Sequence, residues 1–191
     1  MDLVALADTP EDIAYVTAGY IDAASVAQGR CTVESVLALA GTQLPAASYR
    51  LPDGSLWFAR DWWRLHDDAG DPAAIRALFA RRHRAAARAL GFAGDVDGDW
   101  AAYLAGQFGV CLRDVTPETI VWKEWLVARL GAALADPRPD DPRWLADTGA
   151  DIAMLDGLER PFASCDRARF GGSTSRERLI TAARARYPGL V

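Results

Sequence analysis

The spacing of apolar and polar residues predicts a chain that is mainly α-helical. Over most of the sequence, apolar positions recur every three or four residues, as on one face of a helix. Four helix starts share a capping side chain followed by proline: Thr9-Pro10, Asp71-Pro72, Thr116-Pro117 and Asp141-Pro142. We therefore expect long helices over about 72–90 and 117–135, and a helix from 142 that breaks near Gly149.

Shorter signals predict further helices. Segments 32–39 and 100–108 each begin with or follow a capping side chain. Thr174 and Glu177 have the spacing of a capping box, which predicts a final helix near the C-terminus. Ahead of that helix, we expect the segment 164–176 to be a loop.

Strand signals are confined to one segment. "SYRLPDGSLWFAR" holds two short strands around Pro52-Asp53-Gly54, a strong hairpin turn. Residues 20–66 then have the order helix, turn, helix, hairpin, helix, which resembles the winged helix-turn-helix of MerR-like and excisionase-like DNA-binding domains. The expected fold class is mainly α with one β-hairpin. A winged-helix-like unit over 1–70 is followed by a helical bundle over 71–191, packed together as one compact unit.

The resemblance to DNA-binding domains does not extend to their chemistry. "TVESVLALAG", at the place of the recognition helix, offers Glu34 and Ser35 but no basic side chain, whereas base edges are read by Arg, Lys, Asn or Gln. The net charge of −5 also argues against a general nucleic-acid binder. We expect a structural or dimerisation platform and do not expect nucleic acid as a partner.

Composition indicates a soluble, cytoplasmic protein with a sizeable core. Hydrophobic residues make up 51% of the 191-residue chain, which is enough to bury a real core. No charge-free apolar run approaches the roughly 20 residues of a membrane helix, and no charged-then-apolar leader opens the sequence. Cys31, Cys111 and Cys165 have neither disulfide nor zinc spacing, so we expect reduced thiols, no metal and no cofactor.

Three stretches carry a wider resemblance. At "SYRLPDGSLWFARDWW", "GVCLRDVTPETI" and "RPFASCDRARFGG", the sequence is similar to a family of small bacterial proteins labelled as natural-product biosynthesis proteins of unknown function. The likeness spans most of residues 45–180. It implies a cytoplasmic protein that works beside a secondary-metabolite pathway, and it supplies no catalytic residues.

The helix over 117–135 contains the single lysine of the chain. Lys123 and Glu124 both border its apolar face, about 100° apart, so we do not expect them to pair with each other. A carboxylate beside a core needs a partner or its pKa rises. Glu124 is therefore either a proton-transfer group or the acceptor of an arginine such as Arg82 or Arg167. Lys123 either extends to water or binds substrate.

Arginine is concentrated in two blocks, 71–90 and 161–191, within an otherwise acidic chain. The arginines either neutralise the acidic parts on folding or converge on an anionic ligand. On the helix over 72–90, Arg82 interrupts the apolar face, and a half-buried arginine needs an anion. His83 is either a histidine at the edge of the core with a satisfied hydrogen bond or part of a site.

The first functional hypothesis is a small-molecule protein that performs metal-independent acid–base chemistry or binds an anionic intermediate. Glu124 or Asp166 would transfer the proton, with Tyr103 as a donor. The candidates for substrate binding are Arg82, Arg113, Arg167, Arg169, His83 and Lys123. The hypothesis predicts a polar pocket that joins helix 117–135 to segment 162–176.

Two alternatives stay open. A degenerate winged-helix regulator or interaction module predicts a positive face formed by the hairpin and helix 72–90. A non-catalytic partner of a pathway enzyme, or a homodimer, predicts an exposed apolar patch that involves Trp62, Trp63 or Trp144. The sequence does not decide whether the protein is an enzyme.

Overall fold

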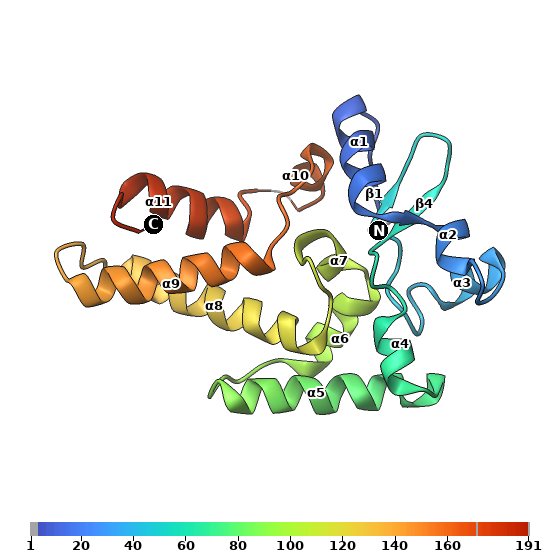
Figure 1. Ribbon diagram of the computed structural model, residues 1–191, viewed down its shortest axis with the longest axis horizontal. Coiled ribbons are helices and arrows are strands. Elements are labelled where there is room, and N and C mark those ends of the chain that lie inside the picture. Colours follow the sequence, from blue (N-terminus) through green and yellow to red (C-terminus); the bar gives the residue numbers. More distant parts are fainter. Residues whose placement is uncertain (1–3, 171, 191) are drawn as a thin grey trace.

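The fold of the computed structural model is mainly α-helical with a small sheet, as the sequence predicts (Figure 1). The structure describes residues 4–170 and 172–190. The helices are, in chain order, α1 Pro10–Gly19, α2 Ala23–Ala27, α3 Val33–Leu39, α4 Arg64–Ala69, α5 Ile75–Ala89, α6 Val96–Leu104, α7 Gln107–Cys111, α8 Pro117–Ala135, α9 Pro142–Leu158, α10 Ser164–Phe170 and α11 Ala182–Arg186. A 3-10 turn, η1 (Pro72–Ala74), precedes α5, and a π-helical segment, η2 (Arg176–Thr181), runs into α11.

Capping side chains start several of these helices where the sequence predicts them. Thr116 caps α8 in a reciprocal capping box with Thr119, and α8 has the length expected from its caps. The predicted box near the C-terminus is also present. The backbone N–H of Thr174 donates to Glu177 Oε2 at 2.9 Å, and the N–H of Glu177 donates to Thr174 Oγ1 at 3.1 Å.

Three expected elements differ from the structure. The helix expected over 100–108 is divided at Gly106, whose φ is +71° and whose Cβ position lies 2.7 Å from the backbone oxygen of Ala46; only glycine fits there. The helix from 142 does not break at Gly149, because packing against α8 outweighs the cost of about 1 kcal/mol for a helical glycine. The expected loop 164–176 begins with α10.

The sheet has four short strands rather than the two of the predicted hairpin. They are β1 Ala5–Leu6, β2 Ile21–Asp22, β3 Tyr49–Arg50 and β4 Leu56–Phe58. β3 and β4 form the hairpin, β1 pairs with β3 in parallel and β2 pairs with β4 antiparallel, giving the order β1-β3-β4-β2. β1 and β2 are two residues long, too short to show an alternating pattern in the sequence.

The hydrophobic core joins both sides of residue 70. One cluster contains Val36, Phe58 and Trp62 together with Phe79 and Tyr103. Residues from both predicted units, 1–70 and 71–191, therefore pack in the same core cluster. The division into these two units stays a prediction.

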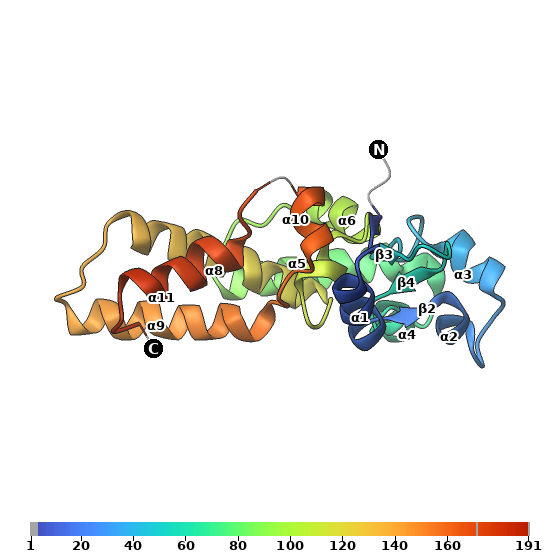
Figure 2. The same ribbon diagram turned by 90° about the horizontal axis from the view of Figure 1, so that it is seen from above.

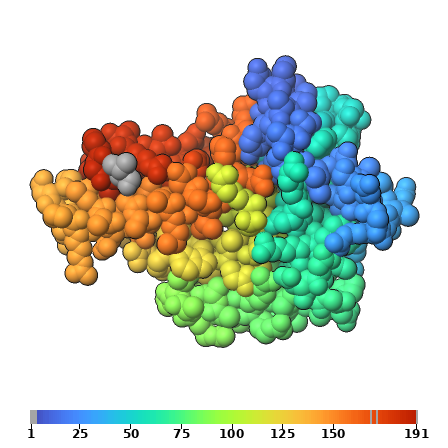
Figure 3. Space-filling model, in the orientation of Figure 1, coloured from blue at the N-terminus to red at the C-terminus, as the bar shows by residue number. Residues whose placement is uncertain are grey.

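The second core cluster lies at the opposite end of the molecule. Leu126 and Leu130 of α8 pack there with Ile152 and Leu155 of α9. In Figure 2, α8, α9 and α11 lie side by side at that end, whereas the sheet and α1 to α4 occupy the other. The space-filling view shows the segment around α8 filling the space between α5 and α9 (Figure 3). Helix α8 is thus the element that links the two ends.

Candidate functional site

A pocket whose walls are more apolar than polar lies between α7, α8 and the segment that follows α9. Its volume is about 270 Å³. The described residues that line it are Gln107, Phe108, Cys111, Lys123, Phe162, Phe170, Gly172, Ser173, Thr174, Ser175 and Arg178. The pocket joins helix 117–135 to segment 162–176, which is where the first functional hypothesis places one.

Lys123 reaches this pocket from α8. Its side chain is 17% exposed, and its Nζ lies 3.9 Å from Glu159 Oε1. The same Nζ donates a hydrogen bond to Cys111 Sγ at 3.2 Å. Lys123 therefore does not extend to open water. It places an ammonium group in a largely buried position.

The ammonium of Lys123 keeps its charge at neutral pH. Burial by itself lowers the pKa of Lys123, but the charges of the Glu159 and Glu124 carboxylates and the hydrogen bond to Cys111 outweigh it, and the pKa is raised. Lys123 is thus a fixed positive charge. It does not have the lowered pKa that a nucleophilic amine requires.

Cys111 supports Lys123 as a neutral thiol. Burial raises the pKa of the Cys111 thiol. Its Sγ also lies 3.7 Å from the backbone oxygens of Gln107 and Phe108, which accept the thiol proton. A thiol sulfur is a weak hydrogen-bond acceptor, so Cys111 positions the ammonium without neutralising it.

Behind the pocket wall, Glu159 is hydrogen-bonded to Ser175. Glu159 is 2% exposed and follows the last residue of α9. Its Oε1 accepts a hydrogen bond from the hydroxyl of Ser175, which lines the pocket. Burial raises the pKa of Glu159, against the opposing effects of Ser175 and Lys123. Its Oε2 has no hydrogen-bond partner among the described residues.

Glu124, the neighbour of Lys123 in sequence, belongs to a different polar cluster. His83 Nε2 lies 2.6 Å from Asp99 Oδ2, and Glu124 is hydrogen-bonded to the same aspartate. Burial and the charge of Asp99 raise the pKa of Glu124 to about 7. Burial lowers the pKa of His83, which favours the neutral imidazole, and the direction of its hydrogen bond with Asp99 follows the tautomer. Glu124 therefore lies beside a second carboxyl group, Asp99, and beside the neutral imidazole of His83.

The other two predicted catalytic residues lie away from the pocket lining. Asp166 is fully buried and accepts hydrogen bonds from the Tyr49 hydroxyl at 2.7 Å and the Ala163 N–H at 3.0 Å. Burial raises the pKa of Asp166. Tyr103 is 2% exposed and stacks on Trp100. Their catalytic roles stay predictions.

Two of the predicted binding arginines pair with carboxylates of the chain. Arg82 donates to Glu118 at 2.6 and 2.9 Å and also to Asp68. Arg167 lies 2.8 Å from Glu177. Neither arginine pairs with Glu124 in the described contacts. These pairs favour the neutralising alternative for Arg82 and Arg167.

The remaining predicted arginines also lie outside the lining. Arg113 is exposed, and Arg169 donates to the backbone oxygen of Ser48 at 3.3 Å. The arginine that does line the pocket is Arg178. Lys123 is therefore the one predicted binding residue that lies in the described lining of this pocket.

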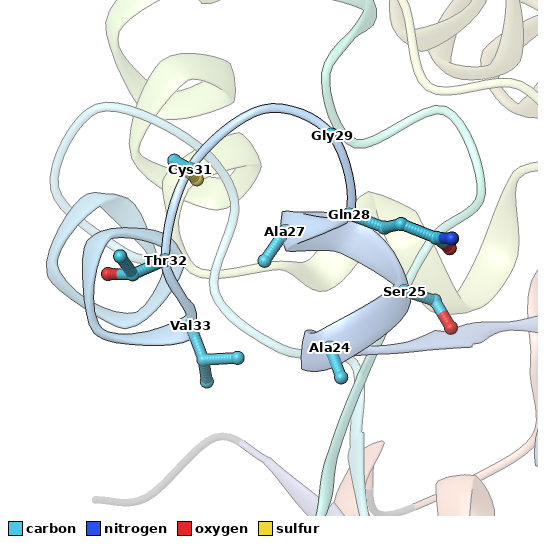
Figure 4. A pocket seen from close by; sticks show the side chains of 8 residues that line it. All are labelled: Ala24, Ser25, Ala27, Gln28, Gly29, Cys31, Thr32 and Val33. Atoms are coloured by element: carbon cyan, nitrogen blue, oxygen red, sulfur yellow. The ribbon is translucent and has the colours of Figure 1, made fainter.

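A wider hollow of about 500 Å³ lies at the turn between α2 and α3 (Figure 4). Figure 4 shows Ser25 and Gln28 on one side of the turn and Cys31 and Thr32 on the other. No charged side chain is among its described lining residues. Because it lacks a charged group to fix a ligand, we favour the pocket of Lys123 as the site.

Sequence reasoning missed three residues of the site. Cys111 was expected only to be a buried thiol, and Glu159 and Ser175 were not singled out. Their contacts with Lys123 and with each other link α7, the end of α9 and the segment before η2, and no local spacing signals such contacts. The one available signal was the single lysine inside an apolar helix.

The fold and the pocket together define a mainly α-helical protein with a largely buried lysine in a pocket that also has aromatic walls. The chain belongs to a family of unknown function (DUF6058), which matches residues 73–188. No curated protein and no solved structure matches the chain. In the described part of the chain, no helix is both long and apolar enough to cross a membrane. Nor do three or more His, Cys, Asp or Glu side chains of that part gather in a way that could hold a metal ion.

Proposed function

We propose that this protein binds a small anionic molecule in the pocket of Lys123 and performs acid–base chemistry on it. The observation that carries the proposal is the Lys123 ammonium, which is largely buried beside a cavity and whose described hydrogen-bond acceptor is a thiol sulfur.

Lys123 forms an ion pair with Glu159 but lacks a strong hydrogen-bond acceptor among the described residues. A buried ammonium has lost its water and requires strong acceptors in exchange. Glu159 Oε1, at 3.9 Å from Nζ, lies beyond hydrogen-bond distance. A carboxylate or phosphate oxygen in the cavity would supply a charge-assisted hydrogen bond of the kind that Lys123 lacks.

The acid–base step is assigned to Ser175 and Glu159. Ser175 lines the pocket and donates to Glu159, so its hydroxyl is in reach of a ligand. The raised pKa of Glu159 brings that carboxyl closer to neutral pH, which suits a group that accepts and returns a proton. Glu124, one residue from Lys123 and with a pKa of about 7, stays the second candidate.

The proposal also includes a cellular setting. A role in a secondary-metabolite pathway and a cytoplasmic location rest on the resemblance carried by the three sequence stretches. The apolar patch that a non-catalytic partner requires has less support, since Trp62 is buried and Trp63 and Trp144 are partly buried.

A binding experiment tests the proposal. Isothermal titration calorimetry with a panel of small carboxylates, aliphatic and aromatic, should detect binding by the wild-type protein. Lys123→Met keeps the apolar stem and removes the charge, so binding should weaken by about tenfold or more.

Arg143→Gln is the matched control, because the Arg143 side chain is 89% exposed and lies outside the pocket lining. It removes one positive charge and should leave carboxylate affinity unchanged. Equal weakening in both variants would point to general charge attraction. The absence of carboxylate binding to the wild-type protein would overturn the proposal.

A further inference from the structure

The aromatic side chains that line the Lys123 pocket indicate what kind of ligand it accepts. Phe108, Phe162 and Phe170 are among its lining residues. The ring centroids of Phe162 and Phe170 are 5.7 Å apart, and the ring planes are inclined by 32°. Two aromatic faces therefore stand beside a cavity that also contains an ammonium group.

Phe170 lines the pocket and is partly open to solvent. It ends α10 and is 41% exposed, one of the few large apolar side chains of the described chain that lie open. The guanidinium of Arg169 lies 5.0 Å from the centre of its ring. A flat apolar ligand in the pocket would cover the open part of this ring, a contact that aromatic side chains favour.

The charge of the lining selects an anion. Lys123 and Arg178 carry positive charge, and none of the described lining residues is acidic. The polar neighbours Ser173, Thr174 and Ser175 are neutral hydroxyl groups. The ligand end that reaches Lys123 is therefore expected to be negatively charged.

The size of the cavity limits the ligand further. A volume of about 270 Å³ lies just below the range of small-molecule sites, which starts at roughly 300 Å³. One ring with a short acidic side chain suits this space, whereas a nucleotide or a peptide does not.

We propose that the ligand is an aryl carboxylate, with its carboxylate on Lys123 and its ring against Phe162 and Phe170. This inference rests on the proposed function, and it adds the chemical class of the molecule that the site accepts.

Three probes of similar length separate the contribution of the aromatic ring to affinity from that of the carboxylate charge. Cinnamate has both, hexanoate has the charge without the ring, and cinnamamide has the ring without the charge. By titration calorimetry we expect cinnamate to bind more tightly than either of the others. The expected margin is about tenfold over cinnamamide, from the contact with Lys123, and about two- to tenfold over hexanoate, from the aromatic contact.

Phe170→Ala tests the aromatic wall. Because Phe170 is exposed at the end of α10, the variant is expected to fold, which far-UV circular dichroism checks. Its affinity for cinnamate should fall by about two- to tenfold, while its affinity for hexanoate stays the same. Met154→Ala is the control, since Met154 is 43% exposed and does not belong to the pocket lining.

The outcomes distinguish the two proposals. If hexanoate binds as tightly as cinnamate, or if Phe170→Ala weakens both equally, the aryl class is wrong while anion binding by Lys123 stands. If cinnamamide binds as tightly as cinnamate, or if no carboxylate binds, the proposed function itself fails, and the aryl carboxylate with it.

Discussion

At the scale of single residues, Lys123 and Glu124 show how two adjacent charges acquire different roles. Neighbouring residues on a helix point about 100° apart. Lys123 therefore reaches Cys111 and Glu159, whereas Glu124 reaches Asp99. The sequence suggests an arginine as the partner of Glu124. In the structure its partner is instead a second carboxyl group.

The pKa of Glu124 predicts a pH dependence of stability. A carboxyl whose pKa is raised to about 7 binds its proton more tightly in the folded protein than in the unfolded chain. Its contribution to the free energy of unfolding is therefore largest in mild acid and is lost as the pH rises toward 7. Glu124→Gln removes this titration and should make the variant more stable than wild type near pH 8, by about 1–2 kcal/mol after allowance for solvent screening of a half-buried carboxyl.

Urea unfolding at pH 5, 6, 7 and 8, followed by tryptophan fluorescence, measures this effect. Glu118→Gln on the same helix is the matched control. Burial tends to raise the pKa of Glu118, but its contact with Arg82 helps to hold the pKa below its ordinary value. The contribution of Glu118 is thus present at neutral pH and lost as the pH falls, the opposite sign. Parallel profiles for wild type and Glu124→Gln would contradict the assignment.

At the scale of elements, α8 explains why Lys123 is buried. The sequence centres the apolar face on Ile120, with Lys123 at its border. The structure buries Ile120 as expected, and it also buries Leu126 and Leu130, because α9 and η2 pack on that side. In a regular helix Leu130 lies only about 20° from Lys123 and about 120° from Glu124. The buried side of α8 therefore extends beyond the predicted face and includes the position of the lysine.

The capping box of α8 offers a prediction at this scale. Thr116 Oγ1 accepts from the Thr119 N–H at 3.1 Å, and Thr119 Oγ1 accepts from the Thr116 N–H at 3.0 Å. Thr116→Ala removes the N-cap of the helix that links the two core clusters and should cost about 1 kcal/mol of stability. Thr17→Ala, which removes an exposed hydroxyl bonded to the carbonyl of Ile13 within α1, should change stability by less than about 0.5 kcal/mol. Equal effects in urea unfolding would show that the cap contributes nothing specific.

At the scale of the whole molecule, the hydrophobic core includes residues that precede the region matched by the family. The match begins at residue 73, yet Phe79 and Tyr103 share a cluster with Val36, Phe58 and Trp62. The helical part therefore buries its apolar side chains partly against the residues that precede it.

The shared core predicts that residues 71–191 do not fold alone. A fragment of that length exposes the faces of Phe79 and Tyr103 that the first 70 residues cover, and burial of each such side chain contributes about 1.5–3 kcal/mol. We expect the fragment to lack a cooperative thermal transition by near-UV circular dichroism, whereas the full chain shows one. A fragment that melts cooperatively would show that the two parts are independent.

The sequence by itself determined the helical class, the positions of most helix starts and the hairpin. These features follow from local interactions: a cap, a proline or a turn acts within a few residues, as at Thr116 and Gly54. It also singled out Lys123, because a lone charge in an apolar helix is visible without any contact.

Only the tertiary structure decided which residues form the site. Cys111, Lys123, Glu159 and Ser175 come from separate parts of the chain, and their meeting depends on how α7, α9 and η2 pack against α8. The same packing paired Arg82 and Arg167 with acids of the chain. Helix periodicity shows which side of a helix is apolar, but the neighbours that cover that side decide which charge is buried with it.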